Sequence, residues 1–159
     1  MSDSEVSLGS DIVVAIGCDH AGRGHKELFK HHIVAKGLKV LDLGVASGVE
    51  RSNYPDVAIK VAKLVEAGQA RFGVLVCGTG VGMAMVANRF KGVRAANCSS
   101  EHMAVMARGH NNANILTLGQ RTIGPSLALS ILEAFLATDF EGGRHQERID
   151  IFDKVYGSE

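Results

Sequence analysis

Val74-Leu-Val-Cys77-Gly-Thr79-Gly-Val-Gly82-Met-Ala-Met-Val-Ala-Asn88 joins a strand, a glycine turn and a helix in one stretch of sequence. Residues 73–77 form an apolar run of strand length, and residues 83–90 favour a helix. Cys77 therefore falls at the carboxyl end of the predicted strand. The glycines of the turn leave backbone N–H groups open, and the start of the helix adds unpaired donors and the positive end of its dipole. We expect this turn to bind an anion beside a thiol.

The same alternation of strands and helices continues on both sides of this stretch. Strands are predicted at 12–16, 38–43, 73–77, 93–98 and 113–118, and helices at 22–36, 55–68, 83–90, 101–108, 125–137 and 144–156. Near-continuous apolar strands that alternate with helices predict an α/β fold, with a doubly wound, Rossmann-like parallel sheet of five strands in the order 2-1-3-4-5 and a C-terminal helix. Residues 1–10 are expected to be a flexible tail, and residues 11–159 a single domain.

Composition narrows the possible partners. The chain has 159 residues, with 17 Lys and Arg against 17 Asp and Glu, so we expect neither nucleic acid nor a membrane surface as a partner. No segment reaches the roughly 20 apolar residues of a transmembrane helix, and residues 1–10 do not resemble a signal peptide. Wide spacing of Cys18, Cys77 and Cys98 argues against a disulfide framework and a zinc site. We expect a cytoplasmic protein with no metal and no cofactor.

Two polar motifs are expected to meet at one edge of the sheet. The string Gly17-Cys-Asp-His20 ends the first strand, which neighbours the third strand and its Cys77 turn in the predicted order. A dinucleotide site is the weaker interpretation, because the glycines of the turn do not match G-x-G-x-x-G and follow the third strand instead of the first. Cys18 and Cys98 are interpreted as small core residues.

A phosphate anchor is suggested by charge spacing. Arg144 and Arg148 are four residues apart, which places both guanidinium groups on one face of a helix, where they suit a phosphate. A solvated helix face is the alternative interpretation of such a pair.

Several motifs match one known family in the same order, from about residue 12 to residue 150. They are Gly17-Cys-Asp-His20, Ser52-Asn-Tyr54-Pro55, Cys77-Gly-Thr-Gly-Val-Gly82, Ala87-Asn88, Gly92-Val-Arg94-Ala, His110-Asn111, Gly119-Gln-Arg121 and Gly142-Gly-Arg144-His-Gln-Glu-Arg148. On these motifs the chain resembles the B-type ribose-5-phosphate isomerases, a family that also holds galactose-6-phosphate isomerase subunits.

The resemblance implies an aldose-ketose isomerase that interconverts ribose 5-phosphate and ribulose 5-phosphate through an enediolate, in the pentose phosphate pathway. Its implied catalytic residues are Cys77 as the base, Thr79 as the proton relay between O1 and O2, and the ring-opening pair His110 and Asp19. Its implied substrate-binding residues are His20, Tyr54, Gly78, Gly80, Val81, Gly82, Asn111, Arg121, Arg144 and Arg148.

The resemblance also implies a homodimer or a dimer of dimers with active sites between subunits. In that arrangement the partner supplies His110, Asn111, Arg121, Arg144 and Arg148. Asn53 and Asn112 stand where many relatives have Asp, so the preferred sugar stays open among ribose 5-phosphate, allose 6-phosphate, galactose 6-phosphate and a tetrose phosphate.

Two other classes of function remain as alternatives. The first is a non-catalytic protein that binds a sugar phosphate, which intact Cys77, Thr79 and His110 argue against. The second is a thiol-based peroxide reducer, for which no resolving cysteine is evident.

Overall fold

A computed structural model of the chain describes residues 11–46 and 51–156. The tail expected at residues 1–10 and part of the loop before Tyr54 lie outside the described residues. The strands are β1 (Val13–Cys18), β2 (Lys39–Asp42), β3 (Phe72–Cys77), β4 (Ala95–Asn97) and β5 (Ile115–Gly119). The helices are α1 (Arg23–Ala35), α2 (Tyr54–Glu66), α3 (Val81–Ala87), α4 (Glu101–Gly109), α5 (Pro125–Ala137) and α6 (Arg144–Asp153), and a 3₁₀ turn, Lys154–Tyr156, follows α6.

The five strands form one parallel sheet, which confirms the predicted fold class. Their order is β2-β1-β3-β5-β4, so the expected order of the last two strands is wrong. Every residue of β5 is buried, whereas β4 has only three residues and all are partly exposed. A strand that is apolar on both faces buries the most apolar surface in a central position. The short β4, which ends in the polar Asn97, therefore lies at the edge of the sheet.

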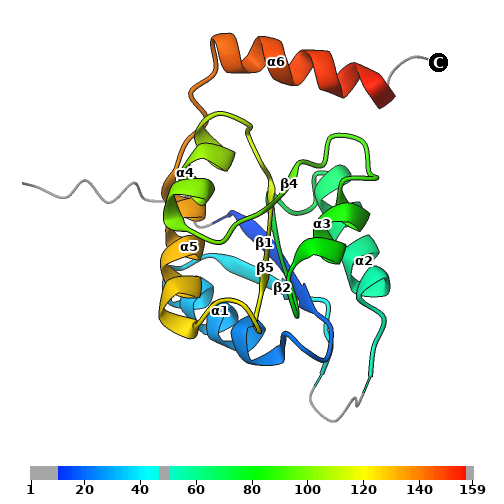
Figure 1. Cartoon of the computed structure of the whole chain (residues 1–159), viewed down its shortest axis with the longest axis vertical. Coiled ribbons are helices and arrows are strands. Elements are labelled where there is room, and N and C mark those ends of the chain that lie inside the picture. The colour runs from blue at the N-terminus through cyan, green and yellow to red at the C-terminus, as the bar shows by residue number, and fades with distance from the viewer. Residues whose placement is uncertain (1–10, 47–50, 157–159) are drawn as a thin grey trace, which may run out of the picture.

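Two helical layers cover the sheet, as Figure 1 shows. Helices α2 and α3 pack together on one face, and α5 packs against α1 and α4 on the other. Successive residues of β1 alternate between these layers: Val14 and Ile16 join the core under α1, α4 and α5, and Ala15 joins the core under α2 and α3. Cys18 and Cys98 are buried in the first core, as expected for small core residues. None of the described helices is long and apolar enough to cross a membrane.

The parallel strands give the sheet two unlike edges. We call the edge where β1, β3 and β5 end the carboxyl edge, and the opposite edge, where β3 and β5 begin, the amino edge. The end of α4 lies at the amino edge, because the chain runs from Gly109 into β5 and Gly73 N donates to Asn114 O at 2.9 Å. Glu141 lies there too, since its N donates to Gly109 O at 3.0 Å. Helix α6 lies across this end of the molecule (Figure 1).

Candidate active site

The Cys77 turn lies at the carboxyl edge, directly after β3. The Cys77 side chain is 6% exposed, and its Sγ accepts a hydrogen bond from Gly80 N at 3.1 Å. Thr79 is exposed in the same turn, and its Oγ1 accepts from Val81 N at 3.3 Å. Gly80 has φ of +81°, and a Cβ there would lie 2.8 Å from Leu118 Cα, so only glycine fits. Backbone N–H groups thus hold the thiol and the hydroxyl side by side.

Two side chains lie close to this turn because its glycines carry no side chains. A Cβ on Gly78 would lie 3.3 Å from Arg121 Nη1, and a Cβ on Gly82 would lie 2.6 Å from the Tyr54 ring. Arg121 N also donates to Gly78 O at 3.1 Å, since β5 ends beside β3. Arg121 therefore lies with Cys77 of its own chain, which corrects its placement among the residues expected from a partner.

The end of β1 adds a carboxylate and an imidazole to the carboxyl edge. Asp19 N donates to Val76 O at 3.2 Å, and Asp19 Oδ1 accepts from Ala21 N at 2.9 Å. His20 and Ser52 exchange two bonds: His20 N donates to Ser52 Oγ at 3.0 Å, and Ser52 N donates to His20 Nδ1 at 3.3 Å. Because Nδ1 accepts, the neutral ring carries its proton on Nε2. Ser52, to which the family resemblance gave no role, thus orients His20.

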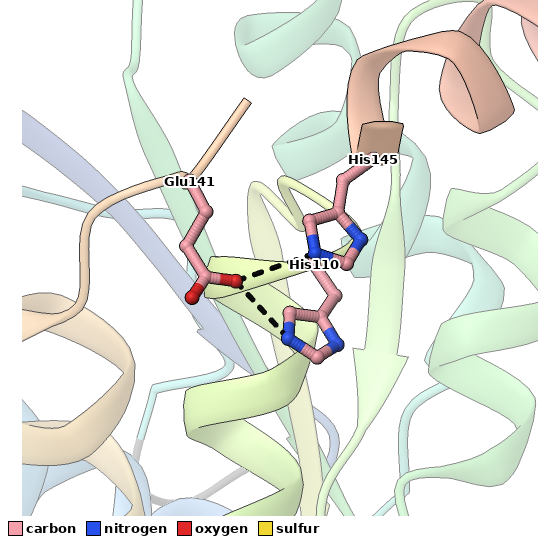
Figure 2. Close-up of side chains that lie close together, drawn as sticks. All are labelled: His110, Glu141 and His145. Carbon is pink, nitrogen blue, oxygen red and sulfur yellow. Dashed lines mark ion pairs between the residues drawn. The ribbon is translucent and has the colours of Figure 1, made fainter. Parts of the chain in front are cut away.

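His110 lies at the amino edge, immediately after α4, and forms a cluster with two residues that sequence reasoning missed. Figure 2 shows His110, Glu141 and His145 together. Glu141 Oε2 lies 3.0 Å from His110 Nε2 and 3.4 Å from His145 Nε2, and the two rings stack at 4.1 Å between centroids. Burial lowers the pKa of His145, and so do the nearby charges of His110 and Arg144. The four-residue spacing of Glu141 and His145 was the available signal.

Arg108 connects the segments that carry this cluster. The residue is buried, and its guanidinium donates to Thr138 O at 3.2 Å and to Ala113 O at 2.6 Å. It also lies over the rings of Phe72 and Phe135, 4.9 and 5.7 Å from their centroids. Burial lowers the pKa of Arg108. These bonds connect the end of α4 to the segment that leads to Glu141.

The other residues expected from a partner are exposed at the amino edge. They are Asn111 in the loop after α4, and Arg144 and Arg148 on α6. Residues 72–77 of β3 separate this group from the Cys77 turn, and a strand of that length spans roughly 16 Å. A pentose phosphate is shorter than this strand. Within one chain, Cys77 and His110 therefore cannot contact the same substrate molecule.

Comparisons with known proteins agree with the motifs. The family model described as Ribose/Galactose Isomerase matches residues 14–152. Ribose-5-phosphate isomerase B of Escherichia coli (strain K12) is 44% identical over 137 residues, which are 86% of this chain and 91% of that protein. D-erythrulose-4-phosphate isomerase of Pectobacterium atrosepticum is 41% identical over 137 residues, 86% of this chain and 90% of that protein.

Solved structures show the same similarity. The crystal structure of ribose-5-phosphate isomerase B from Mycoplasma genitalium with bound ribulose-5-phosphate has a TM-score of 0.90 and 40% sequence identity, covering 93% of this chain and 98% of that one. The structure from Thermotoga maritima has a TM-score of 0.87 and 48% identity, covering 91% and 99%.

Proposed function

This chain belongs to the ribose/galactose isomerase family, and we propose that it interconverts ribose 5-phosphate and ribulose 5-phosphate by proton transfer at Cys77. The observation that carries the proposal is the bond from Gly80 N to Cys77 Sγ at 3.1 Å, which holds the thiol in a turn of open N–H groups. An N–H donor stabilises the thiolate, the form of cysteine that accepts a proton. The type of reaction is inferred from the relatives, which are isomerases: an aldose phosphate is converted into a ketose phosphate of the same atomic composition.

In the proposed reaction, the Cys77 thiolate takes the proton from C2 of the open-chain aldose and returns it to C1. The electrons of the broken C2–H bond move into an enediolate. Its negative oxygens are stabilised by those N–H groups of residues 78–82 that do not donate to Cys77 or Thr79. Thr79 lies exposed in the same turn, and its hydroxyl moves a proton from O2 to O1. Tyr54 packs on Gly82 and limits the sugar on one side.

The phosphate and the closed sugar ring need the second group of residues. We propose that Arg144 and Arg148 of a partner subunit bind the phosphate together with Arg121 and His20 of the first chain. His110 of the partner and Asp19 open the ring, and Asn111 of the partner contacts the sugar. The roughly 16 Å length of β3 supports this division between two chains. Neither edge alone carries the base, the enediolate donors, the partner's ring-opening histidine and all of the phosphate ligands.

A homodimer with two shared sites is the proposed assembly, and a dimer of dimers is compatible with it. The exposed apolar side chains at the end of α6 support a buried role for this helix in an assembly: Ile151 is 68% exposed and Val155, in the turn that follows, is 74% exposed. We propose the cytoplasm and the pentose phosphate pathway as the setting. Free Cys18, Cys77 and Cys98 support a reducing compartment.

A panel of sugar phosphates tests the proposed function. Purified protein is assayed with ribose 5-phosphate, allose 6-phosphate, galactose 6-phosphate and erythrose 4-phosphate, and formation of each ketose is measured as kcat/KM. Ribose 5-phosphate is expected to give the highest value. A tenfold higher value for another sugar would reassign the substrate, and binding without turnover of any of them would identify a non-catalytic binding protein.

A further inference from the structure

The cluster of His110, Glu141 and His145 contains two residues that have no task in the proposed ring opening. Only His110 has a task in the proposed reaction, yet both imidazoles direct Nε2 at the same carboxylate oxygen, as Figure 2 shows. The two rings are stacked with 13° between their planes, and both Nε2 atoms face Glu141 Oε2. Because a metal ion binds an imidazole nitrogen in the plane of its ring, one ring has to turn out of the stack before both nitrogens bind the same ion. Three donor atoms from three separate segments therefore converge on one point.

The spacing of these atoms suits a tetrahedral cation. Zinc binds His nitrogen and carboxylate oxygen at about 2.0 to 2.2 Å, which places tetrahedral ligand atoms about 3.3 to 3.5 Å apart. The nitrogen-to-oxygen distances here are 3.0 and 3.4 Å, and all three donor atoms lie within 4.8 Å of one another. His110, whose side chain is 36% exposed, has room for the rotation that admits an ion. The sequence led us to expect no metal, on the spacing of the cysteines, but none of these three ligands is a cysteine.

The backbone around the cluster is already fixed. Glu141 N donates to Gly109 O at 3.0 Å, and His145 N donates to Gly142 O at 3.1 Å. The His145 side chain is 8% exposed, whereas that of Glu141 is 59% exposed and open to an entering ion. The positive charges of Arg144 and Arg148 act against a cation, so binding is reversible and weaker than at a structural zinc site.

We propose that His110, Glu141 and His145 form a site for zinc or a similar divalent cation at the amino edge, with water as the fourth ligand. On binding, each neutral imidazole loses its Nε2 proton to solvent and takes up one on Nδ1, so that a bare Nε2 faces the ion, and Glu141 provides one carboxylate oxygen. Glu141 gives up its two contacts with the Nε2 protons in exchange for the ion.

The consequence for activity rests on the proposed function of His110. When its Nε2 binds the ion, His110 cannot exchange a proton with the ring oxygen of a partner's substrate. The bound cation therefore inhibits the isomerase reversibly, and inhibition is stronger for a cyclic sugar phosphate than for a tetrose phosphate that has no closed ring.

Metal binding is tested separately from activity. Because the Cys77 thiol is itself a zinc ligand, binding is measured in Cys77→Ala protein, by competition with a chromophoric zinc chelator and by the visible absorption of bound Co²⁺. One ion is expected per chain, with tetrahedral Co²⁺ absorption. His145→Gln and Glu141→Gln are each expected to weaken zinc binding by at least about tenfold. Glu141 is exposed, so its variant remains useful if His145→Gln does not fold.

His102→Gln is the matched control, because His102 lies exposed on α4 away from this cluster, and it is expected to leave the affinity unchanged. Equal zinc affinity in His145→Gln, Glu141→Gln and the control would overturn the site. Zinc inhibition of proteins with Cys77 intact is then compared, each relative to its own zinc-free rate. Inhibition that disappears in His145→Gln supports the proposal, and unchanged inhibition would overturn the regulatory role. Binding at the cluster without inhibition would support the site and overturn the proposed role of His110.

Discussion

The two edges of this sheet are built in different ways. At the carboxyl edge, backbone N–H groups of one short turn hold Cys77 and Thr79, and the glycines among them leave room for Tyr54 and Arg121. At the amino edge, side chains from the end of α4, the following segment and α6 form the cluster of Figure 2, anchored by Arg108. Fixed backbone N–H groups can stabilise an intermediate whose negative charge develops at one position. Long cationic side chains can instead follow a phosphate group that changes position. The chain thus carries the two groups of proposed site residues at opposite edges of its sheet.

The largest effect is expected from removing the thiol at the carboxyl edge. Cys77→Ala deletes the proposed base and should lower kcat for ribose 5-phosphate by about 10² to 10⁴, the usual range for a proton-transfer group. The measurement is ketose formation by purified protein, with circular dichroism as a check on folding. Cys98→Ala is the control, because burial raises the pKa of Cys98 to about 11 and keeps this thiol neutral. More than about a tenth of the original turnover in Cys77→Ala would show that another group is the base.

The second prediction tests whether the two edges of different chains meet. A Cys77→Ala homodimer lacks the base in both sites, and an Arg148→Ala homodimer lacks a phosphate ligand in both, so each should be nearly inactive at low substrate. After subunit exchange in equal amounts, half of the dimers are mixed and each contains one intact site, which gives about a quarter of the original activity. The measurement is activity after mixing, with mass spectrometry to follow the exchange. No recovery despite complete exchange would place both residues in the site of one chain.

A smaller and more selective loss is expected at His110. His110→Asn removes the proposed ring-opening group and should slow the turnover of ribose 5-phosphate, which is mostly cyclic, by about 10². Erythrose 4-phosphate cannot close such a ring and should lose little. Both rates are measured on the same preparation, with His102→Asn as an exposed control on α4. An equal loss on both sugars would contradict the assignment.

Replacing Arg108 is expected to have the smallest effect on the reaction rate, because this residue affects the free energy of unfolding instead. Arg108→Met retains packing over Phe72 and Phe135 but leaves the buried carbonyls of Ala113 and Thr138 without a donor, which should cost about 2 to 3 kcal/mol of unfolding free energy. Urea unfolding measures this change. Arg71→Met is the matched control, because Arg71 also lies over Phe72 but is exposed, and its change should stay within about 0.5 kcal/mol. Equal costs would mean that the ring contact, and not the carbonyl bonds, stabilises the amino edge.

Local features were well predicted where contiguous residues decide them. The expected helix at 22–36 is observed at Arg23–Ala35, and the expected strand at 73–77 is observed as Phe72–Cys77. The helix expected at 83–90 instead spans Val81–Ala87. It begins after the left-handed Gly80, and Asn88 follows its end with two bonds to Ala95, at 2.7 and 3.0 Å. These bonds link residues seven positions apart, and helical periodicity carries no information about them. The sequence pattern therefore placed the end of this helix too late.

The amino edge was less predictable for the same reason. His110 and Arg144 were expected to be functional. The four-residue spacing of Glu141 and His145 could relate those two residues to each other, but their contact with His110 forms only when the segment after α5 folds back onto the end of α4. Arg121 was expected in this group from the family resemblance alone, yet the end of β5 places it beside Gly78 of its own chain.

The sequence by itself determined the α/β class, the family and the Cys77 turn, because each depends on residues close together in the chain or on motifs in a set order. Only the tertiary structure decided that β5 lies between β3 and β4, and which edge each group of residues occupies. The physical reason is that strands compete for central positions by how much apolar surface both faces can bury, and that burial depends on helices distant in sequence. The separation of Cys77 from His110 by the length of β3 follows from that packing.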